Sequence, residues 1–170
     1  ERMQRLYTRD EYMRRIDWLK RSPRNIALST DIIVGFPGET EEDFLDTVRL
    51  LDGVGYDSIF SFKYSPRPNT SALSLSDVVP DEEKQRRLVT VQERQRSIQI
   101  RRNSEMIGSI QEVLVEGRNH SLGQWIGRTS QNRPLNFTHA EGGESLLGSY
   151  LLVLVTRSGP NSLVGEAVPS

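Results

Sequence analysis

The centre of the sequence alternates between strand and helix patterns, and this alternation restricts the fold more than any other feature. Apolar and β-branched residues fill the end of the run Ile26–Val34, which predicts a strand, and a second strand is predicted over Tyr56–Tyr64. Between them Thr40 is placed to cap a helix with three acidic residues in its first turn. This strand–helix–strand unit predicts a parallel α/β sheet or barrel, with both faces of the sheet covered.

Two further helices are expected on either side of this unit. The first is capped by Thr8 and Glu11 and has an apolar stripe that includes Ile16. The second is long and covers residues 81–106, with seven Lys and Arg against one acidic residue between Lys84 and Arg102. Such a charge density attracts phosphate groups, but the alternative of a solvated helix face that packs on the barrel is favoured.

The last third of the chain has a different pattern of residues. Short strand patterns alternate with turns rich in Gly, Asn, Ser and Pro, which predicts a small β-barrel after a boundary near Met106. The five expected strands cover residues 109–116, 124–130, 134–140, 150–156 and 162–168.

Composition excludes several classes of site. The chain has 170 residues, no cysteine and two histidines, so these residues offer no disulfide, no thiolate ligand and no ordinary zinc site. No apolar run approaches the length of a membrane helix, and a cytoplasmic location is expected because no export signal is seen. Because the sequence opens at Glu1 in what looks like the middle of a structure, we expect a longer parent polypeptide.

The turn after the first strand is the strongest candidate for a ligand site. Ligands of parallel α/β proteins bind beyond the carboxyl ends of the strands, where Gly35 and Gly38 allow close approach to the backbone. The alternative is an ordinary strand-to-helix connection. For Glu39 we expect a role in capping the helix that follows rather than in proton transfer.

Four segments in order resemble the radical S-adenosylmethionine methylthiotransferase family. They are QRLYTRDEY (4–12), DIIVGFPGETEEDF (31–44), FSFKYSPRPNTSA (60–72) and GRTSQNRPLNF (127–137), and together they extend over most of the chain. The third and fourth segments are most similar to the family members that modify tRNA. Asn69 replaces the family's usual glycine, and asparagine tolerates the left-handed backbone of such a turn.

The resemblance implies a fold and a division of the chain. Residues 1–79 would form the incomplete C-terminal half of a radical S-adenosylmethionine (β/α) partial TIM barrel, and residues 80–106 a long basic connecting helix. Residues 107–170 would form a small all-β, OB-like barrel, the RNA-binding TRAM domain.

The resemblance also implies an activity for the full-length protein. It would add a methylthio group at position 2 of an isopentenyl-modified adenosine next to the anticodon, using S-adenosylmethionine and two iron–sulfur clusters. Clusters need cysteine thiolates, and this chain has none, so the fragment would be inactive alone. Its partners would be the tRNA anticodon stem-loop and the missing N-terminal half of the polypeptide, with no membrane partner, and the catalytic residues are unknown.

Site residues follow from the same resemblance. Ile33 and Gly35 would lie under the adenine of S-adenosylmethionine, Asp31 would make a polar contact, and Arg5 and Arg67 would bind carboxylate or phosphate unless they are only solvated. The expected RNA contacts lie in the barrel and at the end of the basic helix, and Phe137 has a core position as its alternative. These expected RNA-binding residues are Arg128, Asn132, Arg133, Asn136, Phe137, Arg101 and Arg102.

A second hypothesis needs no catalysis. A stand-alone RNA-binding module that has lost the iron–sulfur clusters also explains a chain without cysteine.

Overall fold

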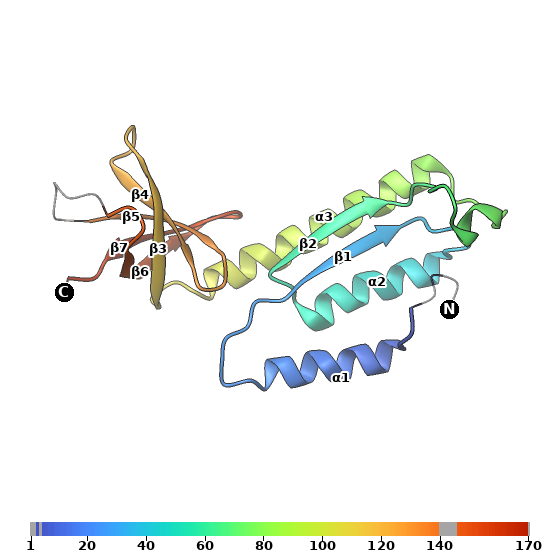
Figure 1. Cartoon of the computed structure of the whole chain (residues 1–170), viewed down its shortest axis with the longest axis horizontal. Helices are drawn as coiled ribbons and strands as arrows, with labels where there is room; N and C mark the ends of the chain where they lie inside the picture. The colour runs from blue at the N-terminus through green and yellow to red at the C-terminus, as the bar shows by residue number, and fades with distance from the viewer. Residues whose placement is uncertain (1–2, 4, 140–145, 170) are drawn as a thin grey trace. The chain divides into compact units, whose positions relative to one another are not determined.

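The structure, a computed structural model, describes residues 3, 5–139 and 146–169 (Figure 1). The chain divides into two compact units, Glu1–Ile98 and Gln99–Ser170, which we describe separately as unit 1 and unit 2. In the described part of the chain, no helix combines the length and apolar character needed to cross a membrane.

Unit 1 contains the predicted strand–helix–strand unit. The two strands pair in parallel from Ser29 opposite Ser58 to Val34 opposite Lys63, which confirms the parallel α/β arrangement. In chain order the elements are α1 (Arg9–Lys20), β1 (Ser29–Val34), α2 (Glu41–Val54), β2 (Ser58–Lys63), a 3₁₀ turn (Ser71–Ser74) and α3 (Asp81–Ser104), which continues into unit 2.

Local sequence signals explain where the first two helices begin. The hydroxyls of Thr8 and Thr40 accept the backbone N–H groups of Glu11 and Asp43, whose carboxylates bond back to the cap residues. The hydrogen bonds from Thr40 hold the pKa of the Asp43 carboxyl below its usual range. Helix α2 ends at Gly55, whose φ of 65° is the left-handed conformation that favours glycine.

Three helices cover the same face of the two-stranded sheet. Ile16 of α1, Phe44 and Leu51 of α2, and Val91 of α3 form one buried cluster with Val34 of β1. Full burial of such side chains contributes about 1.5–3 kcal/mol each. The helices are therefore held to the sheet mainly by this shared apolar core.

The opposite face of the sheet is exposed in the described part of unit 1. Asp31 and Ile33 of β1 lie beside Phe60 and Phe62 of β2, and the two Phe side chains are 61% and 53% exposed. We call these four residues the open face. The expectation that both faces are covered is therefore wrong for this chain, because every helix of unit 1 that shares the core packs against the other side.

A buried ion pair joins α3 to the turn after β1. The Nη1 atom of Arg87 donates to the Glu39 carboxylate at 2.6 Å, and both side chains are almost fully buried. The same Glu39 oxygen accepts the backbone N–H of Gly35 at 2.6 Å. Glu39 therefore does not cap its helix as the sequence suggested, because Asp43 fills that role.

Unit 2 is a closed barrel of five strands, as predicted. The strands pair in the order β3-β4-β5-β7-β6, antiparallel except for β5 with β7, around a core that includes Val113, Leu135 and Val153. Their bounds are β3 (Ile110–Asn119), β4 (Gln124–Thr129), β5 (Pro134–Thr138), β6 (Tyr150–Ser158) and β7 (Leu163–Ala167). Ala140, the end of the third expected strand, lies outside the described residues.

The last turn of α3 belongs to the barrel. Asn103 is 3% exposed, and its side-chain amide donates to the carbonyl oxygens of Gly159 and Pro160. The Asn103 side-chain oxygen accepts a hydrogen bond from the guanidinium of Arg133. One buried side chain thus ties the helix end to two connections of the barrel.

We expect Arg87→Ala to lower the free energy of unfolding of unit 1 by about 3 kcal/mol, because it leaves the buried Glu39 carboxylate without its charged partner. Urea denaturation followed by far-ultraviolet circular dichroism measures this change. The matched control is Arg94→Ala, which removes an exposed pair with Asp52 and should cost less than about 1 kcal/mol. Equal costs for the two variants would show that the buried pair has no special role.

We expect Asn103→Ala to destabilise the barrel by about 2 kcal/mol, because it leaves buried polar groups without partners. Fluorescence of Trp125, which lies in the barrel core, reports this transition in urea. Ser104→Ala, which removes a hydroxyl bonded only to the Arg101 carbonyl within the helix, is the control. An unchanged barrel transition in Asn103→Ala would contradict the role assigned to Asn103.

Candidate functional site

The turn at the carboxyl end of β1 is filled by protein groups. Gly35 has a φ of 73°, and a Cβ atom there would lie 2.3 Å from the Cγ atom of Lys84. The Lys84 Nζ atom lies 5.6 Å from the centre of the Tyr64 ring, and Phe36 packs edge-on against the same ring. Packing of Lys84 and the left-handed φ therefore account for glycine at position 35, and its N–H is already bonded to Glu39.

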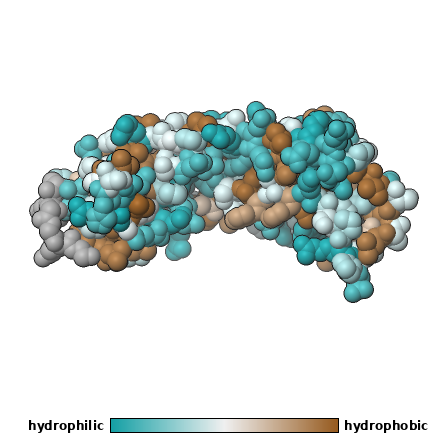
Figure 2. Space-filling model, turned by 90° about the horizontal axis from the view of Figure 1, so that it is seen from above, coloured by the Kyte–Doolittle hydropathy of each residue, from teal (hydrophilic) through white to brown (hydrophobic). Residues whose placement is uncertain are grey.

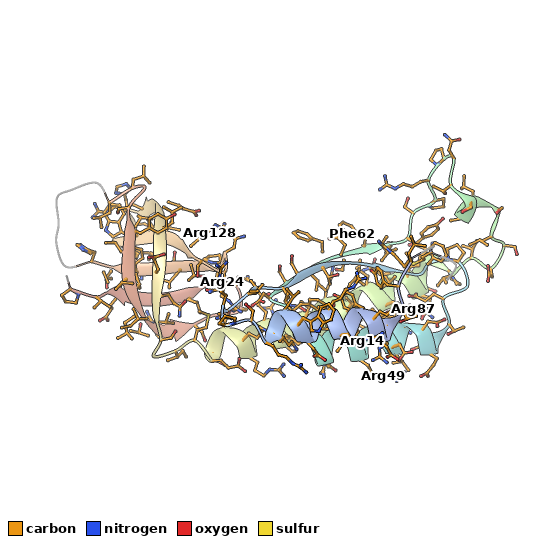
Figure 3. All side chains as sticks on the ribbon, turned by 60° about the horizontal axis from the view of Figure 1, so that its bottom comes forward. Arg14, Arg24, Arg49, Phe62, Arg87 and Arg128 are labelled. Carbon is orange, nitrogen blue, oxygen red and sulfur yellow. The ribbon has the colours of Figure 1, made fainter. Side chains whose placement is uncertain are left out.

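The open face places Asp31 and Ile33 on the surface of the sheet. Both side chains point away from the core of unit 1, with Phe60 paired to Asp31 and Phe62 paired to Ile33. Figure 3 shows Phe62 on the side of the strands away from the helices. This surface offers a carboxylate among apolar groups, which suits a ligand with an apolar ring and hydrogen-bond donors.

A cavity of about 470 Å³ lies along β1. Its lining includes Arg5, Tyr7 and all four consecutive residues from Thr30 to Ile33, so it follows the edge of β1 that does not pair with β2. The structure thus brings Arg5, Asp31 and Ile33 together. Gly35 and Arg67 do not line this cavity, and Arg67 lies in an exposed loop where its carbonyl accepts the Thr70 hydroxyl.

The loop after β2 keeps the turn that the sequence predicted. Asn69 has a φ of 63°, so asparagine adopts the left-handed conformation in place of glycine.

The barrel brings three predicted RNA contacts together around the turn between β4 and β5. The Nη1 atom of Arg128 donates to both the backbone and side-chain oxygens of Asn132, and its Nε atom donates to Glu116 at 3.1 Å. Asn132 closes the turn in the left-handed conformation, with a φ of 61°. Arg133 follows at once, so two guanidinium groups and one exposed amide lie on a short turn.

Two of the predicted barrel contacts have different surroundings. Asn136 is partly exposed on β5, opposite Ile126 of β4. Phe137 is fully buried in the barrel core, so it offers no surface on which a base can stack. The expectation that Phe137 binds RNA is therefore wrong. Its side chain points into the barrel, as that of Leu135 does, because every second residue of a strand faces the same side.

Part of the basic charge of α3 is neutralised within unit 1. Arg86 pairs with Glu41 and Glu83, and Arg94 pairs with Asp52. Together with the buried pair of Arg87, these contacts pair three of the seven basic residues between Lys84 and Arg102 with carboxylates. Arg101 and Arg102 lie in the last turn of the helix, where Arg101 is exposed 4.0 Å from Glu105.

Sequence reasoning did not identify two residues that shape these surfaces. Arg87 was counted as one of several basic residues, and no local pattern showed that Glu39 is its partner. Asn103 was not considered, since a polar residue near a helix end gives no signal of burial. Among the described residues, no cluster of His, Asp and Glu side chains is arranged to hold a metal ion.

Comparisons with known proteins assign the barrel. The TRAM domain model matches residues 104–168, which includes all five barrel strands and the end of α3.

Three curated relatives match nearly the whole chain, and each is a tRNA-2-methylthio-N(6)-dimethylallyladenosine synthase. The protein of Solibacter usitatus is 71% identical over 166 residues, which are 97% of this chain and 37% of that protein. Those of Koribacter versatilis and Geobacter metallireducens are 54% and 48% identical, over 98% and 97% of this chain and 38% and 37% of theirs. The chain thus spans a little over a third of the length of these relatives. We conclude that it matches the C-terminal part of tRNA-2-methylthio-N(6)-dimethylallyladenosine synthases and carries a TRAM domain.

Proposed function

We propose that this chain forms the C-terminal part of a tRNA methylthiotransferase. The full protein would attach a methylthio group to position 2 of an isopentenyl-modified adenosine next to the anticodon. The observation that carries the proposal is the 71% identity to a synthase named for this product, over 97% of the chain. Within that enzyme, unit 1 would supply part of the S-adenosylmethionine site and unit 2 would bind the tRNA.

The open face is the part of unit 1 best suited to S-adenosylmethionine. Ile33 offers an apolar surface for the adenine ring, and the Asp31 carboxylate accepts hydrogen bonds from its donors. Arg5, which shares a cavity with both, is suited to the methionine carboxylate. Gly35 would contribute only its backbone carbonyl group, since its N–H is bonded to Glu39. The Arg67 side chain would have to extend to the cofactor from its exposed loop.

The iron–sulfur clusters would be held outside this chain. Cluster iron is ligated by cysteine thiolates in nearly all such sites, and these residues include no cysteine. When bound, the cofactor and clusters supply the radical and the sulfur, while this chain binds, orients and shields the substrates. The cluster-bearing N-terminal region is therefore the expected covalent partner of unit 1.

A chimera tests the enzyme proposal directly. This chain would replace the matching 37% of the Solibacter usitatus synthase, and nucleoside mass spectrometry of tRNA from a strain lacking the activity would detect the product. We expect methylthiolated adenosine. Loss of the product in a folded chimera with intact clusters would contradict the enzyme proposal. It would favour the RNA-binding module if the chain still binds RNA.

We expect Asp31→Ala in the same chimera to weaken S-adenosylmethionine binding by about tenfold, because a hydrogen bond to a charged group is lost. Equilibrium dialysis with labelled S-adenosylmethionine measures this change without relying on turnover. Asp10→Ala, which removes an exposed carboxylate from the first turn of α1, is the control. Unchanged affinity in Asp31→Ala would remove Asp31 from the site.

We expect the chain to bind an anticodon stem-loop RNA, and Arg128→Ala to weaken binding several-fold and to reduce the salt slope by about 1. Fluorescence anisotropy at several salt concentrations measures both quantities. Arg157→Ala, an exposed arginine on β6 of the same barrel, is the matched control. Arg133→Ala is a poor probe because Arg133 also holds Asn103. If Arg128→Ala binds as the wild type does, the RNA surface lies elsewhere.

A further inference from the structure

Helix α1 exposes basic residues and a tryptophan on the side opposite the core. Arg14, Trp18 and Arg21 are spaced by four and three residues, so they lie on one side of the helix and its C-cap. Ile16, the buried residue of α1, points the other way. Arg24 is exposed in the segment that follows (Figure 3). We call Arg14, Trp18, Arg21 and Arg24 the α1 basic face.

The arginines of this face form no ion pair in the described part of the chain, and only Arg14 has an acidic residue, Glu11, close enough for a longer-range attraction. Between Arg14 and Arg24 the sequence has five Lys and Arg and one acid, Asp17. Within the described ranges 5–139 and 146–169, the guanidinium groups of Arg14, Arg21 and Arg24 form no ion pair. The acidic residues of α1 lie mostly in its first turn, where Glu11 is engaged by Thr8.

Other arginines of unit 1 show how different this arrangement is. Arg86, Arg87 and Arg94 of α3 pair with carboxylates, and Arg49 of α2 pairs with Glu42 and Asp46. Arg86, Arg87 and Arg94 therefore help to dock α3, and Arg49 is paired within its own helix. The α1 basic face keeps its charge available to a partner in solution.

Trp18 adds an apolar surface to this charge. Its side chain is 71% exposed, whereas Trp125, the other tryptophan of the chain, lies in the barrel core at 9%. Figure 2, which is drawn from the top of Figure 1 and so from the side away from α1, shows other hydrophobic groups set among hydrophilic residues. An exposed aromatic flanked by unpaired arginines is the combination that binds nucleic acid, since arginine pairs with phosphate and the ring stacks on a base.

We infer that the α1 basic face is a second RNA-binding surface, separate from the residues of the barrel. The inference rests on the proposed function, because it assigns the same tRNA a further contact with unit 1. RNA is favoured over an acidic protein because three exposed guanidinium groups without ion pairs lie on one helix, its C-cap and the segment that follows, and a phosphate backbone offers several charges to such a group. The expected ligand is a stem backbone with an unpaired base near Trp18.

Tryptophan fluorescence gives a direct test in which all the arginines are kept. The anticodon stem-loop RNA is added at saturating concentration, and acrylamide quenching is compared between the wild type and Trp18→Phe, which isolates the signal of Trp18. We expect bound RNA to shield Trp18 several-fold from acrylamide. The readout needs no variant of the arginines, so it does not depend on how those variants fold.

A substitution test measures the energetic contribution. Replacing Arg14, Arg21 and Arg24 together by Ala should weaken RNA binding roughly tenfold near 0.1 M salt and reduce the salt slope by about 2 to 3. Arg49→Ala is the matched control, since it is exposed on the neighbouring helix but paired with acids. Circular dichroism of the triple variant checks that α1 remains folded.

The outcomes separate this inference from the proposed function. If the RNA binds but Trp18 stays accessible and the triple variant keeps its salt slope, the α1 basic face is not an RNA surface and the proposed function stands. If the chain does not bind the RNA at all, the RNA-binding part of the proposed function fails and this inference fails with it. Shielding of Trp18 by phosphatidylglycerol vesicles but not by RNA would assign the face to a lipid surface instead.

Discussion

The buried ion pair between Arg87 and Glu39 holds together the parts of unit 1 that meet at the end of β1. Its two side chains are 6% and 11% exposed, and the guanidinium also donates to the Glu39 backbone oxygen. Burial disfavours the charged form of Arg87, but hydrogen bonds to Glu39 and Glu83 outweigh it, so the pKa of Arg87 is raised. Because Glu39 also holds the N–H of Gly35, a single charged contact fixes the turn and docks α3 against it.

This arrangement leaves one side of the sheet available. The helices share the core with Val34 and Leu51, and the open face presents Asp31 and Ile33 beside exposed Phe side chains. Exposure of such an apolar sheet surface to water is unfavourable, and patches of this kind often mark binding sites. The same surface suits a cofactor that the rest of a larger protein covers. The proposed S-adenosylmethionine contacts are assigned to it for this reason.

Charge pairing changes which surfaces can meet RNA. From residue counts alone α3 looks like the basic element, yet three of its arginines are paired with acidic residues of unit 1, such as Glu41, Glu83 and Asp52. In the barrel, Arg133 is engaged by Asn103, and Arg128 has Glu116 as a neighbour. In α1 the acidic residues of the first turn lower the net charge of the helix, so a residue count does not single it out as basic. These acidic residues lie at the opposite end of the helix from Arg21, whose charge therefore stays exposed.

The sequence by itself determined the order of the elements, the two capping boxes, the parallel pair of strands and the five strands of the barrel. These features follow from residues close together in the chain: Thr40 with Asp43, the apolar period of α2, and the alternation that places Leu135 and Phe137 on one side of β5. The same alternation already placed Phe137 on one side with Leu135, but only the closed barrel decided that this side is the interior. Contacts between distant residues, such as Arg87 with Glu39 and Asn103 with Gly159, were decided by the tertiary structure, because hydrogen-bond and ion-pair partners 48 and 56 residues apart leave no periodic signal in the sequence.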